Sequence, residues 1–149
     1  MIETLRPRVN VTIDVQDAIT GVLLHRQRVH NLVVTAGRNL LRDFLNGDAV
    51  TGLTHFAVGT DATAAAATDT TLGAEVFRDA LTAKVEDTAK LTCRYYLASG
   101  DANGDTLAEA GLLTAAVAGT MYARVVLAST IAKTTSIAVT FTWELTFSV

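Results

Sequence analysis

The stretch SIAVTFTWELTFSV, residues 136–149, alternates between apolar and polar side chains along its length. Its apolar side chains occupy every second position: Ile137, Val139, Phe141, Trp143, Leu145, Phe147 and Val149. A period of two places them all on one face of a β-strand, whereas a helix would spread them around its axis. A strand this long needs other strands to cover its apolar face and pair its backbone groups. We therefore expect the central aromatic residues of this segment to be buried together in a β-sheet.

Strand patterns recur through the rest of the chain. The segments concerned are residues 8–17, 22–30, 53–60, 75–87, 88–99, 111–119 and 120–130. The first two predict a hairpin, and residues 75–87 and 88–99 predict another that turns around Glu86–Ala89. Residues 61–73, rich in alanine and threonine, predict a loop because Thr and Asp flank the alanine run.

Residues 36–46 follow a different period. The large apolar side chains of this segment share one helical face: Leu40, Leu41, Phe44 and Leu45. Thr35 is expected to cap the start of the helix, and Asn46-Gly47 to end it. The apolar stripe is expected to close one end of a sheet.

The chain has 149 residues, a length that fits one domain with a substantial core. Seven or eight alternating strands with short turns and only one helix favour antiparallel over parallel sheet. The sequence therefore predicts a mainly β fold. We expect a single antiparallel β-sandwich or barrel-like domain over residues 9–149, with one short amphipathic helix at about residues 36–46. Residues 1–8, MIETLRPR, are expected to form an N-terminal arm.

Charge, hydropathy and cysteine usage narrow the possible partners. The chain has 12 basic and 15 acidic residues and a net charge of −3, which disfavours nucleic-acid binding. No apolar run is long enough to span a bilayer, so no membrane association is expected. Cys93 is the only cysteine, which excludes an intrachain disulfide, and its alternating surroundings predict a buried thiol.

The segment SGDANGDTLAEAGLL is the densest cluster of polar residues. Asp101, Asn103 and Asp105 alternate like the first three ligands of a calcium-binding EF-hand loop. However, position six of such a loop is Thr106 instead of glycine, and position twelve is Leu112 instead of glutamate. We therefore expect a structural turn whose carboxylates cap backbone amides, with a bound cation as the alternative.

Glu109 lies in the same segment among leucine and alanine neighbours, so we expect it to be buried. A buried carboxylate needs partners such as backbone amides or an arginine, for which Arg78 and Arg124 are candidates. A catalytic acid is the alternative. No second carboxylate lies at a spacing that indicates a catalytic pair, so the structural role is favoured.

No other motif predicts an active site. His25, His30 and His55 lack the HxH and HExxH spacings of metal sites, and a regular strand would put the first two on opposite faces. The chain contains no GxSxG elbow, no phosphate-binding loop and no GxGxxG motif before a helix. We therefore expect a protein that is not an enzyme, with no catalytic, cofactor-binding or metal-binding residues.

The order of several short motifs is more informative than any one of them. The chain reads VVTAGRNLLRDFLNG, then LTHFAVGTDATAAAATDTTLGAEVFRDALT, then GDANGDTLAEAGLL, then ARVVLASTIAKTTSIAVTFTWELTFS. Over roughly residues 30–149 this order resembles small tail-associated virion proteins of tailed bacteriophages. It is more distantly similar to the N-terminal domain of phage tail-collar fibre proteins. Those proteins share a helix after T-x-G, a strand ending A-V/I-G-T/D-G, a TxLxxEVxR segment and an E-x-G-L motif before a valine-rich strand.

The resemblance implies a non-enzymatic structural protein of the virion, assembled in the host cytoplasm. A tail, baseplate or fibre-attachment component is the first expectation, and a capsid decoration protein is the alternative. The implied partners are further copies of the chain, as a homotrimer or higher symmetric oligomer, and other phage virion proteins. A carbohydrate-binding module is disfavoured because Trp143 lies on the apolar side of its strand. An enzyme is disfavoured because only Glu109 and the turn before it offer converging polar groups.

Overall fold

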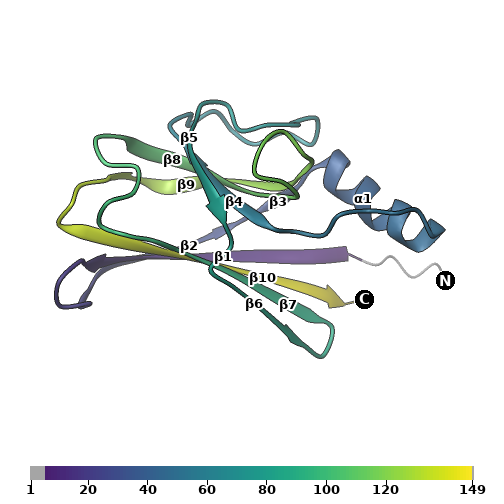
Figure 1. Cartoon of the computed structure of the whole chain (residues 1–149), viewed down its shortest axis with the longest axis horizontal. Helices are drawn as coiled ribbons and strands as arrows, with labels where there is room; N and C mark the ends of the chain where they lie inside the picture. Colours follow the sequence, from purple (N-terminus) through teal and green to yellow (C-terminus); the bar gives the residue numbers. More distant parts are fainter. Residues whose placement is uncertain (1–5, 149) are drawn as a thin grey trace.

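The computed structural model describes residues 6–148, which form ten strands and one helix (Figure 1). The elements are β1 (Arg6–Asp17), β2 (Leu23–His30), β3 (Leu32–Val33), α1 (Thr35–Asn46), β4 (His55–Gly59), β5 (Glu75–Ala80), β6 (Ala83–Asp87), β7 (Lys90–Leu97), β8 (Thr106–Leu113), β9 (Met121–Ala132) and β10 (Ile137–Ser148). The predicted mainly β fold is confirmed.

The strands form two antiparallel sheets of five strands each. The first sheet has the order β2-β1-β10-β7-β6, and the second has the order β3-β9-β8-β4-β5. Neither sheet closes on itself, so the architecture is a sandwich and not a barrel. The longest pairing joins the two ends of the described chain, because β1 and β10 run side by side from Arg6–Ser148 to Asp17–Ile137.

The core lies between the sheets and is centred on aromatic side chains. Phe141 and Trp143 of β10 are fully buried, as the alternation predicted. The ring of Phe56 from the second sheet lies 4.7 Å from that of Phe141 and 5.4 Å from that of Trp143. It also stacks on Tyr95 of β7 at 4.5 Å. Since these rings come from both sheets, they hold the sandwich together.

The predicted strand over residues 75–87 is wrong, because the structure divides it between the two sheets. β5 pairs with β4 in the second sheet, whereas β6 pairs with β7 in the first. Between them the amide of Leu81 donates to the carbonyl of Thr54, and the amide of Thr82 donates to that of Arg94. These two hydrogen bonds fix the point at which the chain crosses from the second sheet to the first. This division and the two-residue β3 raise the strand number above the expected seven or eight.

The helix is confirmed, but two expectations about it are wrong. Val34, and not Thr35, is the residue at the N-cap, and no side chain caps the helix there. Thr35 is already helical, and its amide donates to the carbonyl of Ala67 in the alanine-rich loop. The end is as expected, with Gly47 in the left-handed conformation. The apolar stripe covers the sheet only in part, because Phe44 is 67% exposed and its neighbour Leu45 is 79% exposed.

Residues 1–5 of the expected N-terminal arm lie outside the described residues, and residues 6–8 open β1. Within residues 6–148, no helix is both long and apolar enough to cross a membrane.

Candidate functional site

The polar turn between β7 and β8 is held by its own side chains. The carboxylate of Asp101 accepts a hydrogen bond from the amide of Ala98 at 2.9 Å, which is the capping that the sequence predicted. The side-chain amide of Asn103 donates to the carbonyl of Ser99 at 2.8 Å. Gly104 has a φ of +90°, a conformation that L side chains rarely adopt. Two of the three candidate calcium ligands are thus engaged within the turn.

Lys133 supplies the positive charge of this turn, a role that sequence reasoning missed. Only 1% of Lys133 is exposed. Its ammonium group lies 3.0 Å from the side-chain oxygen of Asn103, 3.1 Å from the carbonyl of Thr134 and 3.4 Å from the carbonyl of Ser99. Burial lowers the pKa of Lys133, and the charge of Asp101 opposes this shift. The ammonium therefore binds one of the three candidate calcium ligands, Asn103, and two backbone carbonyls beside the turn.

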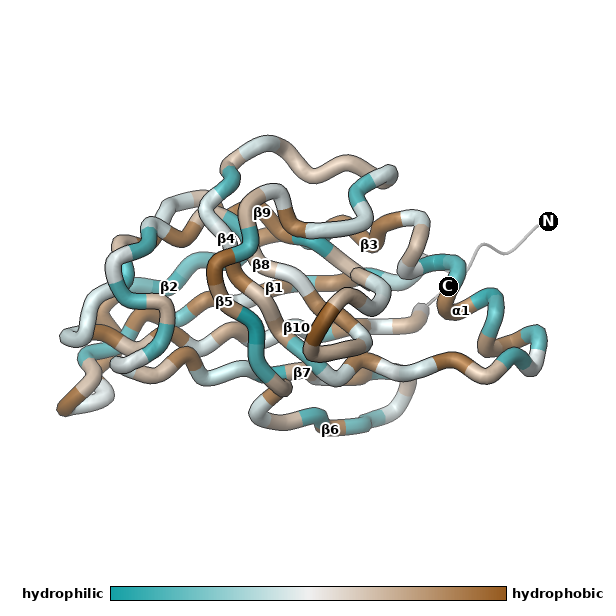
Figure 2. Tube along the Cα trace, turned by 45° about the horizontal axis from the view of Figure 1, so that its top comes forward, coloured by the Kyte–Doolittle hydropathy of each residue, from teal (hydrophilic) through white to brown (hydrophobic). Residues whose placement is uncertain are grey.

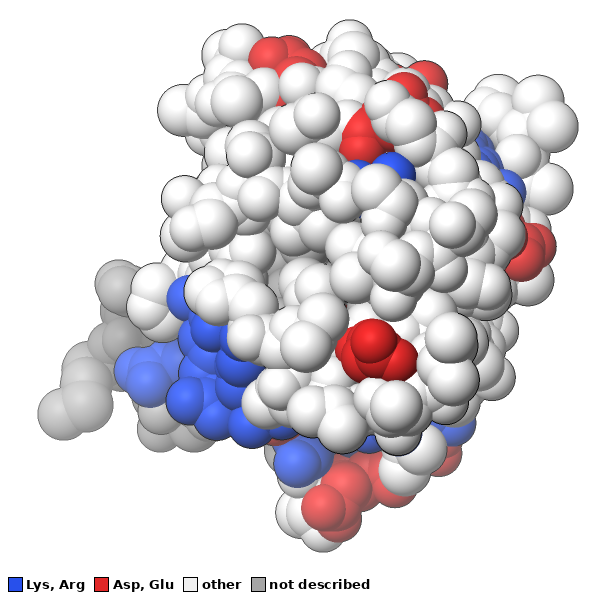
Figure 3. All heavy atoms as spheres, turned by 90° about the vertical axis from the view of Figure 1, so that its left-hand side faces the viewer, with Lys and Arg blue, Asp and Glu red and all other residues white. Residues whose placement is uncertain are grey.

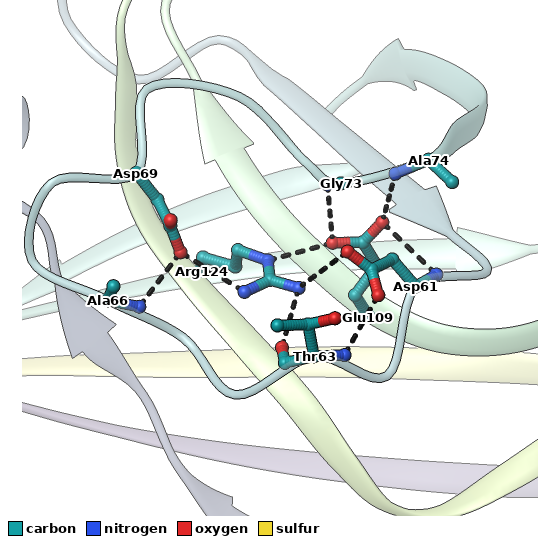
Figure 4. Close-up of polar contacts among 8 residues, drawn as sticks. All are labelled: Asp61, Thr63, Ala66, Asp69, Gly73, Ala74, Glu109 and Arg124. Carbon is teal, nitrogen blue, oxygen red and sulfur yellow. Dashed lines mark hydrogen bonds and ion pairs between the residues drawn. The ribbon is translucent and has the colours of Figure 1, made fainter.

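Glu109 lies in the middle of β8 and not in the turn, and it is completely buried. Its carboxylate accepts hydrogen bonds from the amides of Gly73 at 2.9 Å and Ala74 at 2.8 Å (Figure 4). A longer bond of 3.4 Å comes from the amide of Asp61. The guanidinium of Arg124 on β9 donates to the same carboxylate at 2.8 Å. The prediction that Glu109 is buried against backbone amides and an arginine is confirmed.

Arg124 extends this network to the far side of the loop 60–74. It is 3% exposed and donates to the carboxylate of Asp69 at 3.1 Å and to the carbonyl of Thr63 at 2.9 Å (Figure 4). Burial opposes its charge, but the hydrogen bonds and charges of Glu109 and Asp69 outweigh this effect and raise the pKa of Arg124. We call Glu109, Arg124 and Asp69 the loop clamp, because together they fix both halves of the loop to the second sheet.

Arg78, the other arginine considered as a partner of Glu109, does not join the clamp. Its guanidinium pairs with Glu75 at 2.7 Å and donates to the carbonyls of Ala115 and Ala118. It therefore ties β5 to the loop between β8 and β9.

Two glycines allow the loop to approach the sheet closely. A Cβ atom at Gly59 would overlap the carboxylate of Glu109 and the carbonyl of Ala74. A Cβ atom at Gly73 would overlap the carboxylate of Asp61. The glycines of AVGT and TLGAEV thus lie against the glutamate of EAGLL. Segments far apart in the sequence meet at the clamp.

A polar hollow of about 330 Å³ lies beside the clamp, lined by Asp61, Thr63, Asp69 and Arg124 among others. The amide of Thr63 donates to the carboxylate of Asp61 and lowers the pKa of Asp61.

The carboxylate of Glu109 already accepts hydrogen bonds from Arg124 and the loop amides. This geometry favours a role for Glu109 as a structural anchor over a role as a catalytic acid.

The other residues considered as sites lie apart from the clamp. His25 and His30 belong to β2 in the first sheet, while His55 belongs to β4 in the second and bonds Thr54 at 2.7 Å. Cys93 is buried, and burial raises the pKa of its thiol to about 11. Within residues 6–148, no group of three or more His, Cys, Asp or Glu residues is placed to hold a metal ion.

Exposed large apolar side chains gather in two places among residues 6–148. The turn between β1 and β2 carries exposed side chains at Ile19, Val22, Leu23 and Leu24. At α1, the exposed Phe44 borders a groove of about 200 Å³ between the helix and the ends of β7 and β10. Figure 2 shows hydrophobic chain at the tip of the β1–β2 turn and alternating hydropathy along α1. Sequence reasoning missed both surfaces, since alternation alone does not show which apolar residues stay uncovered.

Fold and site define this chain as an antiparallel β-sandwich with a buried acid–arginine clamp. No protein family model, no curated protein and no solved structure matches it.

Proposed function

We propose that this protein is a non-enzymatic structural component of a tailed-phage virion, placed in the tail or baseplate or at the attachment of a fibre. The observation that carries the proposal is the convergence of the resemblance motifs on the loop clamp. Glu109 of EAGLL binds the amides of Gly73 and Ala74, which directly precede the EVFR segment. Gly59 of AVGT touches the same carboxylate. The segments that carry the resemblance to phage tail proteins therefore lie together at the loop clamp, which supports the proposal.

The exposed apolar surfaces support a role in assembly. Phe44 and Leu45 on α1 are mostly exposed, and so is Ile19 at the other end of the molecule. Large apolar side chains that gather on a surface are typical of sites that another protein covers. We therefore propose that the chain forms a homotrimer or higher symmetric oligomer and binds other virion proteins.

Quantitative mass spectrometry of purified particles tests the proposal. A small multiple of three or six copies per particle is expected for a tail or baseplate position. Hundreds of copies would instead assign the protein to the capsid surface as a decoration protein. Absence from the particles would refute the virion role altogether. The identity of the neighbouring genes provides an independent check, since genes for tail proteins are expected beside it.

A further inference from the structure

Strand β6 forms an open edge of the first sheet. It pairs with β7 on one side, and among residues 6–148 no strand pairs with its other side (Figure 1). The opposite edge of this sheet is already bound, because the side-chain amide of Gln27 on β2 donates to the carbonyl of Ser129 on β9 and accepts from its amide. Both described ends of the chain, Arg6 on β1 and Ser148 on β10, lie on the β7 side of β6. An open edge of this kind is a template for a further strand.

The side chains of β6 alternate between the two faces of the sheet. Lys84, Val85 and Glu86 are all exposed, and Val85 is 59% exposed. The register with β7 places Lys84 opposite the buried Cys93, so Lys84 lies on the inner face of the sheet. Val85 therefore follows on the outer face, and Glu86 returns to the inner face. The ammonium of Lys84 donates to the carbonyl of Leu53 at 2.8 Å.

The order of these side chains selects one register for two copies of β6. When a two-fold axis relates two antiparallel strands, opposite side chains share a face only if one residue pairs with its own copy. With Lys84 at the axis, two ammonium groups would lie opposite each other, and with Glu86 there, two carboxylates would. With Val85 at the axis, Lys84 of each copy lies opposite Glu86 of the other. Of the three central registers, only this one brings opposite charges together.

We propose that β6 of one copy pairs antiparallel with β6 of a second copy, with the two Val85 side chains opposite each other at a two-fold axis. The contact joins the first sheets of both copies into one continuous sheet. It covers Val85 on the outer face and forms two pairs between Lys84 and Glu86 on the inner face. This inference rests on the proposed role as an assembling protein and names one surface that assembles. Combined with a separate three-fold contact, it would link two trimers.

The charges of β6 favour a second copy over other partners. Charged side chains on an edge strand usually prevent pairing. Here they repel a strand in the neighbouring registers and attract one that carries the same Lys-Val-Glu order in the opposite direction. Figure 3 shows acidic and basic side chains close together on the lower side of the molecule, where the first sheet lies. A surface with both signs does not repel a second copy as a surface of one sign would.

The space beside β6 can accept the side chains of a second strand. A hollow of about 640 Å³ lies there, lined by Leu53, Lys84, Val85 and Leu91 among others. Because β6 has only five residues, the contact is small, and we expect it to form at high protein concentration.

Disulfide formation across the axis tests the contact directly. Val85→Cys would place two thiols opposite each other, within the range that a disulfide spans. On oxidation of the full chain, this single variant is expected to form a disulfide-linked dimer. Val22→Cys is the matched control, because Val22 is also 59% exposed but lies in the turn between β1 and β2. It is expected to link at least about tenfold more slowly, since its thiols meet only by collision. Cys93 is buried and does not compete.

Charge reversal tests the register. Sedimentation of the wild-type chain at high concentration is expected to show species larger than its mass of 15.7 kDa. Lys84→Glu or Glu86→Lys turns both charge pairs into like-charge pairs, so each variant is expected to associate about tenfold more weakly. An equal mixture of the two variants restores both pairs and is expected to associate as the wild type does. Rescue by mixing separates the contact from any effect of Lys84→Glu within its own chain, such as the lost bond to Leu53.

Three results would overturn this inference. They are a Val85→Cys variant that links no faster than Val22→Cys, a wild-type chain that stays monomeric at every concentration, and charge-reversed variants whose mixture associates no better than either alone. A protein that links through Val85→Cys but is absent from phage particles would support the contact and refute the virion role. A protein that is present in particles but does not link would support the virion role and refute the contact.

Discussion

Replacing Glu109 with Gln tests the loop clamp without changing the shape of the side chain. The carboxylate is completely buried and accepts hydrogen bonds from Gly73, Ala74 and Arg124. Glutamine keeps one oxygen, which can still accept from Ala74. The other position becomes an NH₂ group that faces the amide of Gly73 and the guanidinium of Arg124. Two donors then lose their acceptor, and the buried arginine keeps only Asp69 as a charged partner within 3.5 Å.

The size of the effect follows from these lost bonds. A hydrogen bond to a charged group contributes about 1.5–3 kcal/mol, and removing one partner of a buried ion pair costs about 3–5 kcal/mol. We expect Glu109→Gln to lower the free energy of unfolding by about 3 kcal/mol. For a domain of this size, that corresponds to a fall in melting temperature of about 10 °C. The amides of the loop 60–74 should also exchange hydrogen faster, because the clamp holds that loop.

Urea unfolding followed by fluorescence or circular dichroism measures the change. Glu144→Gln is the matched control, since Glu144 is half-exposed and lies 3.8 Å from Lys90. A surface pair of this kind contributes little, so the control is expected to change stability by less than about 0.5 kcal/mol. A loss below about 1 kcal/mol for Glu109→Gln, or a loss equal to that of the control, would refute the clamp as an anchor. Adding Arg124→Met to Glu109→Gln should cost less than the two single changes together, because they share one interaction.

Four further changes test other parts of the structure. Trp143→Ala should cost about 3–5 kcal/mol in urea unfolding, and a change near zero would show that its ring is not in the core. With a thiol pKa of about 11, native Cys93 should not react with a thiol reagent at pH 8 until the protein unfolds; rapid labelling would contradict its burial. Neither calcium nor EDTA should shift the melting temperature, and a saturable rise with calcium that Asp101→Ala abolishes would make the turn a metal site. The amide of Thr63 lowers the pKa of Asp61 in the folded state. The charged carboxylate of Asp61 therefore stabilises the fold above the unfolded pKa near 3.8, and this stabilisation is lost as the pH falls through the lower folded pKa. The protection factors of the amides in the loop 60–74, corrected for the fall of intrinsic exchange with pH, should therefore decrease below about pH 4, and constant protection across that range would argue against this cap.

The strands could be predicted where their pattern is local. The alternation around Trp143 identified β10 and its buried face, because a period of two depends only on neighbouring residues. The corner at Leu81 could not be predicted in this way, since its bond to Thr54 joins residues distant in sequence. The burial of Glu109 followed from its apolar neighbours. Lys133 was missed because no local signal shows that the turn 99–105 folds over its side chain.

The helix also shows what a local sequence pattern can and cannot predict. The sequence predicted the apolar stripe of the helix and its end at Gly47. Which part of the stripe is covered depends on where α1 lies relative to the sheets. Gly37 packs against the backbone of Tyr122, and the helix runs outward from that contact, so Phe44 and Leu45 remain exposed.

The pairing of β1 with β10 has a consequence for synthesis of the chain. β1 is synthesised before its main partner, residues 137–148, which is made more than a hundred residues later. Until then Val9, Val11 and Ile13 lack the neighbouring strand and much of the core that buries them. The first sheet therefore completes late, and such distant pairing favours slow folding. A premature stop codon anywhere before residue 137 would remove the central strand of the first sheet, so we expect even a product that contains all the other strands to be degraded and not assembled.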